Sequence, residues 1–217
     1  MSIVSQGILG GFSGKTGPVI GSSWKGKPVM RAKPIYKKNR TFSKDQMSQQ
    51  EKFKMMMTFL HGIDYLLNLT YKTNNNTRSG FQEAFSVNLK DAVAGVESPF
   101  DIDYAKVRLS KGSIPTIAQC ILTAEASNMV AFSWNGAVPE NNGNKSSTAD
   151  KAIAVLYSPE DKNFLVSHFS TRRSDEELLL DAAAFTGKEV HGWFFFLSDD
   201  ESRASDSKYV GTVTVSG

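Results

Sequence analysis

Cysteine, histidine and long apolar runs are scarce in this chain of 217 residues. It contains one cysteine, Cys120, and three histidines, His61, His168 and His191. A single cysteine excludes an internal disulfide and any metal site that needs several thiolates. The histidines show no His-x-x-His spacing, so the sequence predicts no metal site. No window approaches the run of about 18 apolar residues that a membrane-spanning helix needs.

The lone cysteine lies among apolar residues, Ile117, Ile121 and Leu122. Reactive thiols need an accessible, electropositive setting, so we interpret Cys120 as a buried structural thiol. No basic residue precedes Lys15, and glycines interrupt the short apolar run at the start. We therefore expect no secretory signal peptide. The protein is expected to be cytoplasmic or part of an assembled particle, without membrane contact.

Acidic residues are missing from the start of the chain, since the first is Asp45. Residues 1–54 hold eleven Lys and Arg against two acidic residues, a net charge of +9. The remainder holds 14 basic and 20 acidic residues, a net charge of −6. A basic end and an acidic body suit nucleic acid, an acidic partner or head-to-tail contact between copies.

Glycine and serine alternate with apolar residues over residues 3–36. This pattern predicts short extended segments joined by glycine turns, with a hairpin near Gly26-Lys27. The stretch has too few large side chains to fold around itself. We therefore expect it to lie on another surface, either its own body or a neighbouring copy.

The pattern becomes helical after residue 40. Ser43 and Gln46 have capping-box spacing, and apolar residues then recur at three- and four-residue steps. They predict a helix over residues 44–71, on which Phe59 and Met55 would remain outside the main buried stripe as an oligomer seam. A second helix near residues 79–94 and a strand over residues 101–109 are expected next, with a domain boundary at the turn of residues 111–112.

From residue 113 the pattern is all β. Seven short runs separated by turn clusters indicate an antiparallel β-sandwich of fibronectin III or immunoglobulin type, with Trp134 and Trp193 as core anchors. The expected class is α+β. Residues 1–112 would form a basic glycine-rich arm with two helices and a strand, and residues 113–217 the sandwich. The runs are 117–123, 129–134, 152–157, 164–169, 177–180, 190–197 and 209–215.

The opening sequence is similar to that of an uncharacterised bacterial domain family of unknown function. The resemblance rests on residues 7–17 (GILGGFSGKTG) and 21–26 (GSSWKG), and continues with residues 103–112 (DYAKVRLSKG). It covers most of the chain, including the β-rich C-terminal half. The resemblance supports this layout and implies no activity.

Residues 10–16 (GGFSGKT) imitate a phosphate-binding loop, but Leu9 stands where the first glycine belongs. Pro18 and Gly21 follow, so no helix N-terminus would receive the anion. No nucleophile-elbow pattern accompanies the histidines. We predict no catalytic, cofactor-binding or metal-binding residues, and no enzyme.

The sequence therefore predicts a non-enzymatic structural or protein-interaction module that self-associates through its basic N-terminal arm. Two alternatives stay open: a nucleic-acid-binding protein that uses the same arm, and a β-sandwich that binds a ligand through its loops at residues 139–147 and 198–206. The acidic runs 175–177 and 199–201 could receive the arm of another copy. The predicted partner-contact residues are Phe12, Trp24, Lys25, Arg31, Lys37, Lys38 and Arg40.

Overall fold

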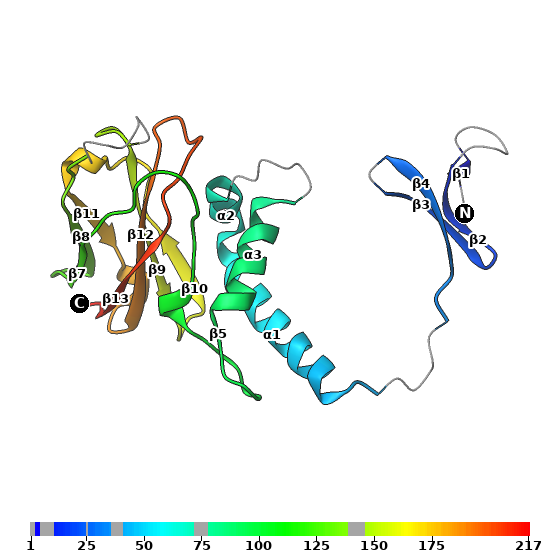
Figure 1. Ribbon diagram of the computed structural model, residues 1–217. Coiled ribbons are helices and arrows are strands. Elements are labelled where there is room, and N and C mark those ends of the chain that lie inside the picture. Colours follow the sequence, from blue (N-terminus) through cyan, green and yellow to red (C-terminus); the bar gives the residue numbers. More distant parts are fainter. Residues whose placement is uncertain (1–2, 5–10, 25, 36–40, 72–77, 139–145) are drawn as a thin grey trace. The chain divides into compact units, whose positions relative to one another are not determined.

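The computed structural model describes residues 3–4, 11–24, 26–35, 41–71, 78–138 and 146–217. Its contacts divide the chain into two compact units, Met1–Ser43 and Lys44–Gly217 (Figure 1). Both units contain antiparallel sheets, and the second also contains the helices. The chain is therefore of the α+β class, as predicted.

The N-terminal unit is a four-stranded antiparallel sheet whose strands follow each other in chain order. Gly17, at φ +58°, lies between the second and third strands, and Gly26, at φ +77°, lies between the third and fourth. Glycine adopts this left-handed conformation without steric cost. The predicted extended segments with glycine turns are confirmed. The strands are β1 (Ile3–Val4), β2 (Phe12–Thr16), β3 (Val19–Trp24) and β4 (Lys27–Ala32).

The helices open the second unit. They are α1 (Lys44–Leu60), the 3₁₀ turn η1 (His61–Ile63), α2 (Asp64–Thr70) and α3 (Gly80–Asp91). At the start of α3, Ser79 Oγ accepts from Gln82 N and Gln82 Oε1 accepts from Ser79 N, both at 3.2 Å, so a capping box fixes this terminus. A Cβ on Gly80 would lie 2.6 Å from the carbonyl oxygen of Leu67. Glycine therefore lets α3 begin directly against α2.

The strand predicted over residues 101–109 is wrong beyond its first two residues. Val107 and Leu109 are buried alternately, as in a strand. The backbone between them binds a side chain instead of another strand, because Arg108 N donates to Asn88 Oδ1 at 2.7 Å. The elements here are β5 (Val93–Ala94), β6 (Asp101–Ile102) and the 3₁₀ turn η2 (Tyr104–Lys106).

Seven further strands form two antiparallel sheets, one in the order β10-β9-β12-β13 and one in the order β11-β8-β7. Each of the seven predicted runs overlaps one of these strands. Their bounds are β7 (Cys120–Ala124), β8 (Met129–Trp134), β9 (Lys151–Ser158), β10 (Asn163–Val166), β11 (Glu177–Asp181), β12 (Glu189–Leu197) and β13 (Lys208–Thr214). The 3₁₀ turns η3 (Arg173–Asp175) and η4 (Ala183–Phe185) flank β11.

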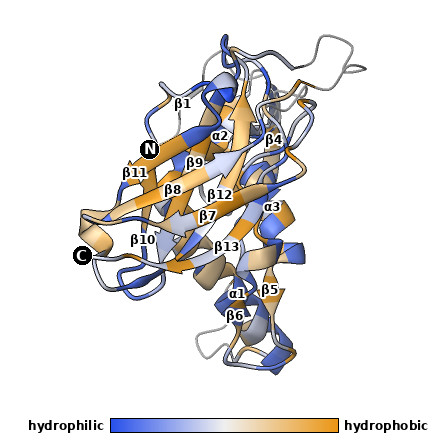
Figure 2. Cartoon of the chain, turned by 90° about the vertical axis from the view of Figure 1, so that its left-hand side faces the viewer, coloured by the Kyte–Doolittle hydropathy of each residue, from blue (hydrophilic) through white to orange (hydrophobic). Residues whose placement is uncertain are grey.

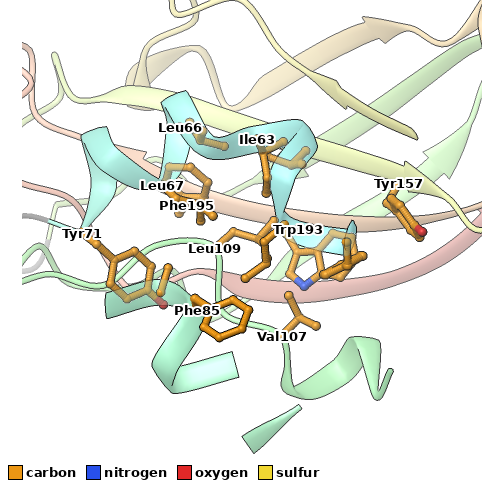
Figure 3. Close-up of a cluster of buried hydrophobic side chains, with 14 of the residues drawn as sticks. Ile63, Leu66, Leu67, Tyr71, Phe85, Val107, Leu109, Tyr157, Trp193 and Phe195 are labelled. Atoms are coloured by element: carbon orange, nitrogen blue, oxygen red, sulfur yellow. The ribbon is translucent and has the colours of Figure 1, made fainter. Parts of the chain in front are cut away.

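The four-stranded sheet of this unit is buried on both faces. On one face, Leu156 and Phe194 belong to a hydrophobic cluster that also contains Phe132 of the three-stranded sheet. On the other face, Trp193 and Phe195 belong to a second cluster with residues of the helices. Figure 3 shows Trp193 and Phe195 in this second cluster, together with Leu66 and Leu67 of α2.

Trp134 and Trp193 are both buried, as predicted, but on opposite faces of that sheet. The expectation that Phe59 stays outside the buried stripe is wrong. Phe59 is 5% exposed and packs edge-on against Tyr157, with ring centroids 4.9 Å apart. The side chain of Met55 is half-buried.

The division between the units falls at Ser43 and differs from the boundary expected near residue 112. The helices share a hydrophobic cluster with β9 and β12, so they belong with the strands. Gly112 lies against the chain near β13 instead of in a linker. A Cβ there would lie 1.9 Å from the carbonyl oxygen of Ala204, and Gly112 N donates to Asp206 Oδ1 at 3.0 Å.

Candidate interaction surface

The N-terminal sheet has two chemically different faces. Successive side chains of a strand point to opposite faces, and the register pairs Gly14 with Gly21 and Gly21 with Met30. These residues therefore share one face, which carries no charge in β2–β4 and which we call the uncharged face. Its members are Phe12, Gly14, Thr16, Val19, Gly21, Ser23, Pro28, Met30 and Ala32.

The opposite face, which we call the basic face, combines cations with apolar groups. The register places Trp24 opposite Lys27 and Ile20 opposite Arg31, so each of these large apolar side chains has a cation beside it. The face contains no acidic residue in β2–β4. Its members are Ser13, Lys15, Ile20, Ser22, Trp24, Lys27, Val29 and Arg31.

Glycine on the uncharged face makes room for an aromatic ring. A Cβ on Gly21 would lie 2.2 Å from the carbonyl oxygen of Phe12 and 2.6 Å from a carbon of its ring. The Phe12 side chain therefore lies across the strand next to its own. Phe12 remains only half-buried, and Gly21 is the one buried residue in the described parts of residues 11–35.

The structure separates the predicted contact residues. Phe12 belongs to the uncharged face, whereas Trp24 and Arg31 belong to the basic face. The other four predicted residues lie outside the described residues; they are Lys25, Lys37, Lys38 and Arg40.

Three further surface residues of this sheet were not predicted from the sequence: Met30, Val29 and Ile20. Met30 is 70% exposed, and Trp24 is 64% exposed. The period-two alternation of apolar and basic residues in β4 could have assigned Val29 and Arg31 to one face.

The acidic loop at residues 199–201 is engaged within the second unit. Asp199 pairs with Arg172, and Glu201 Oε1 lies 2.7 Å from Lys151 Nζ. Asp200 accepts hydrogen bonds from nearby serines, which lower the pKa of its carboxyl group. This loop is therefore a poor receiver for a basic partner.

A small polar cluster lies beside the helices. His191 Nδ1 is 2.8 Å from the Tyr209 hydroxyl, and the Tyr104 ring stacks on His191 with centroids 4.0 Å apart. Burial lowers the pKa of His191 and raises the pKa of Tyr209. At neutral pH both groups are uncharged, so their contact is an ordinary hydrogen bond in a half-buried setting.

A cavity of about 610 Å³ adjoins this cluster, between the end of α3 and β13. Its lining includes three cationic side chains, Lys90, Lys106 and Arg108, and one acidic residue, Asp91. Lys106 Nζ is already 2.8 Å from Asp103 Oδ2 outside the lining. The charge of its lining favours an anion over a cation. Its cationic side chains are exposed to solvent, however, so they would bind an anion only weakly.

The described residues offer little for metal or phosphate chemistry. No group of three or more His, Cys, Asp or Glu among them could hold a metal ion. Residues 12–16, part of the apparent phosphate-binding loop, form β2, and residues 14–16 of this strand pair with β3. Burial raises the pKa of the Cys120 thiol to about 12, which keeps it protonated at neutral pH.

Comparison with known proteins identifies a matching family but no function for the chain. The sequence profile of a family of unknown function, DUF6266, matches residues 11–211. No curated protein matches the chain. None of the helices in the described residues is long and apolar enough to cross a membrane.

Proposed function

We propose that the chain, which belongs to DUF6266, a family of unknown function, is a non-enzymatic interaction module that self-associates through its N-terminal sheet. The second unit would act as the folded body that this sheet joins to other copies. The cationic residues beyond β4 would contribute to the same contact.

The observation that carries this proposal is the lack of burial in the N-terminal sheet. None of its described side chains between residues 11 and 35 is buried, and Trp24 and Met30 are largely exposed. A small sheet without a covered hydrophobic face is marginal in water. Covering one large apolar side chain contributes about 1.5–3 kcal/mol. A partner surface would therefore supply the stability that the sheet cannot supply itself.

Charge supports a second copy as this partner. Residues 1–43 contain eight basic residues and no acidic residue, so residues 44–217 contain 17 basic and 22 acidic residues. The units therefore carry net charges of +8 and −5. Opposite potentials favour encounter between the first unit of one copy and the second unit of another.

For the body, we propose a β-sandwich of fibronectin III or immunoglobulin type. In chain order, the first, second and fifth of its seven strands form one sheet, and the other four form the second. The fourth strand, β10, pairs with the third, as in members of this class that extend the sheet containing strands C, F and G. One hydrophobic cluster joins the facing sides of both sheets.

Solution mass tests the proposed function. Light scattering after size exclusion compares the masses at low and high salt. At low salt it should give a multimer for the full chain and a smaller mass for the double variant Trp24→Ser with Met30→Ser. Ile35→Ser is the matched control, because Ile35 is 97% exposed but lies beyond β4. A full-length mass of 23.8 kDa at both salts would contradict self-association.

A nucleic-acid partner is the second candidate, favoured by one observation. Trp24 lies beside Lys27 on the basic face, and stacking on an aromatic ring next to cations is how many proteins hold single strands. This function predicts copurified nucleic acid with high absorbance at 260 nm, and binding that weakens steeply as salt is raised.

A further inference from the structure

Among the described residues of the second unit, the outer face of the three-stranded sheet carries large apolar side chains that are exposed, although Ala131 of its central strand is buried. Both faces of the four-stranded sheet lie in hydrophobic clusters, and the inner face of the three-stranded sheet lies in one of them. Figure 2 looks onto β11, β8 and β7, which lie side by side. The register and the alternation of side chains assign Ile121, Thr123, Met129, Ala131, Ser133, Glu177, Leu179 and Asp181 to the outer face.

This outer face is apolar at its centre and acidic in charge. Ile121 is 62% exposed and Leu179 is 55% exposed, although both are large apolar residues within strands. Glu177 and Asp181 lie at the two ends of β11. Glu125 follows β7, and its Oε1 accepts from Thr123 Oγ1 at 3.4 Å on the same face. The three strands contain no Lys or Arg.

The basic face of the N-terminal sheet matches this surface in both charge and size. It carries three cations, Lys15, Lys27 and Arg31, where the outer face with Glu125 carries three carboxylates. It also offers Trp24 as an apolar group to meet Ile121 and Leu179. Strands β2, β3 and β4 have 5, 6 and 6 residues, and strands β7, β8 and β11 have 5, 6 and 5.

We propose that the basic face of the N-terminal sheet of one copy packs on the outer face of the three-stranded sheet of a second copy. This inference rests on the proposed self-association and names its receiving surface. The two sheets would pack about 10 Å apart, bringing Lys and Arg side chains against Glu and Asp while the exposed apolar groups become covered. The contact joins two different surfaces, so repetition makes a ring or a filament.

The contact is expected to be weak for each pair of copies, since two faces of three short strands make an interface at the small end of the known range. Its ionic component is also screened by salt. Masses should therefore be compared at low salt and over protein concentrations from about 5 to about 200 µM, which brackets micromolar dissociation constants.

Two charge-reversed chains test the pairing. The donor variant carries Lys15→Glu, Lys27→Glu and Arg31→Glu. The receiver variant carries Glu125→Lys, Glu177→Lys and Asp181→Lys. Each variant alone should have the mass of a monomer, because like charges then meet. An equimolar mixture should regain the wild-type assembly, since each variant's sheet fits the other variant's receiving face.

A control variant changes charge equally elsewhere. It carries Glu97→Lys, Glu160→Lys and Glu189→Lys, three exposed acidic residues outside the outer face. It should keep the wild-type mass.

A second receiver variant tests the same surface without a change of charge. It carries Ile121→Ser and Leu179→Ser, and it is needed because Asp181→Lys also removes the hydrogen bond that Asp181 Oδ1 accepts from Ala183 N at 3.0 Å. Thermal unfolding confirms that each variant is folded.

The outcomes separate this inference from the proposed function. If the wild-type chain is a monomer throughout, self-association fails and the inference fails with it. If the wild type assembles and both folded receiver variants assemble equally well, self-association stands and the receiving surface lies elsewhere. If the mixture of donor and receiver variants gains no mass, the sheet does not dock on a second copy in this way.

Discussion

At the scale of single residues, the second unit contains a buried ion pair with few partners. The side chains of Arg173 and Asp150 are 2% and 4% exposed, and Nε of Arg173 lies 3.4 Å from Oδ2 of Asp150. The guanidinium carbon lies 3.6 Å from the centroid of the Phe196 ring. Burial lowers the pKa of Arg173, because desolvation disfavours the charged form.

We therefore expect Asp150→Ala to lower the free energy of unfolding by about 3–5 kcal/mol, since the buried guanidinium loses its counter-charge. Asp103→Ala, which breaks the exposed pair with Lys106, should change it little. Urea unfolding measures both. Equal effects from the two substitutions would show that burial of Arg173 does not set the cost.

Cys120 gives a chemical prediction at the same scale. Burial raises the pKa of its thiol from 9.0 to about 12, and the thiolate is the reactive form. At pH 8 the folded chain should react with a thiol reagent far more slowly than the chain in denaturant. A native rate equal to the denatured rate at pH 8 would contradict the partial burial of this group.

At the scale of elements, the N-terminal sheet depends on Gly21. We expect Gly21→Ala to disrupt this sheet, because the new Cβ would lie 2.2 Å from the backbone of Phe12. Hydrogen exchange of residues 12–32 should then accelerate, and assembly should be lost. Ser23→Ala on the same face is the control and should leave both unchanged. Slow exchange in the Gly21 variant would mean that the strands can separate enough to accept a side chain.

Most elements could be predicted from the sequence because their signals are local. Turn residues and short apolar runs marked all seven strands of the two larger sheets of the second unit. Three- and four-residue steps marked residues 44–71 as one helix, which the structure divides into α1, η1 and α2. The segment 107–109 was wrongly predicted as a strand, because its side chains alternate between buried and exposed. This pattern is the same whether the backbone pairs with a strand or with a side chain such as that of Asn88.

The packing of the helices on β12 was missed although the sequence carries a signal for it. Residues 193–197 (WFFFL) form an unbroken apolar run, which is typical of a strand buried on both faces. A sandwich strand with one solvent face would alternate. Composition alone could not assign residues to the two faces of the N-terminal sheet, because this assignment depends on the register of β2, β3 and β4.

At the scale of the whole molecule, burial and charge are divided between the units. Both hydrophobic clusters lie within residues 44–217, so that unit holds the residues that drive folding. Residues 1–43 hold eight basic residues and no acidic residue. The chain therefore joins a self-sufficient body to a basic sheet that has exposed apolar side chains.

Removing residues 1–43 should abolish assembly and leave the remaining chain folded. The expected product is a monomer whose thermal midpoint lies within a few degrees of that of the full chain, because no residue of either cluster is lost. Light scattering and thermal unfolding measure the two properties. Addition of the folded receiver variant Glu125→Lys, Glu177→Lys, Asp181→Lys supplies the N-terminal sheet in trans, and the truncated chain, which keeps its acidic outer face, should bind it. A truncated chain that still assembles would assign self-association to the body instead.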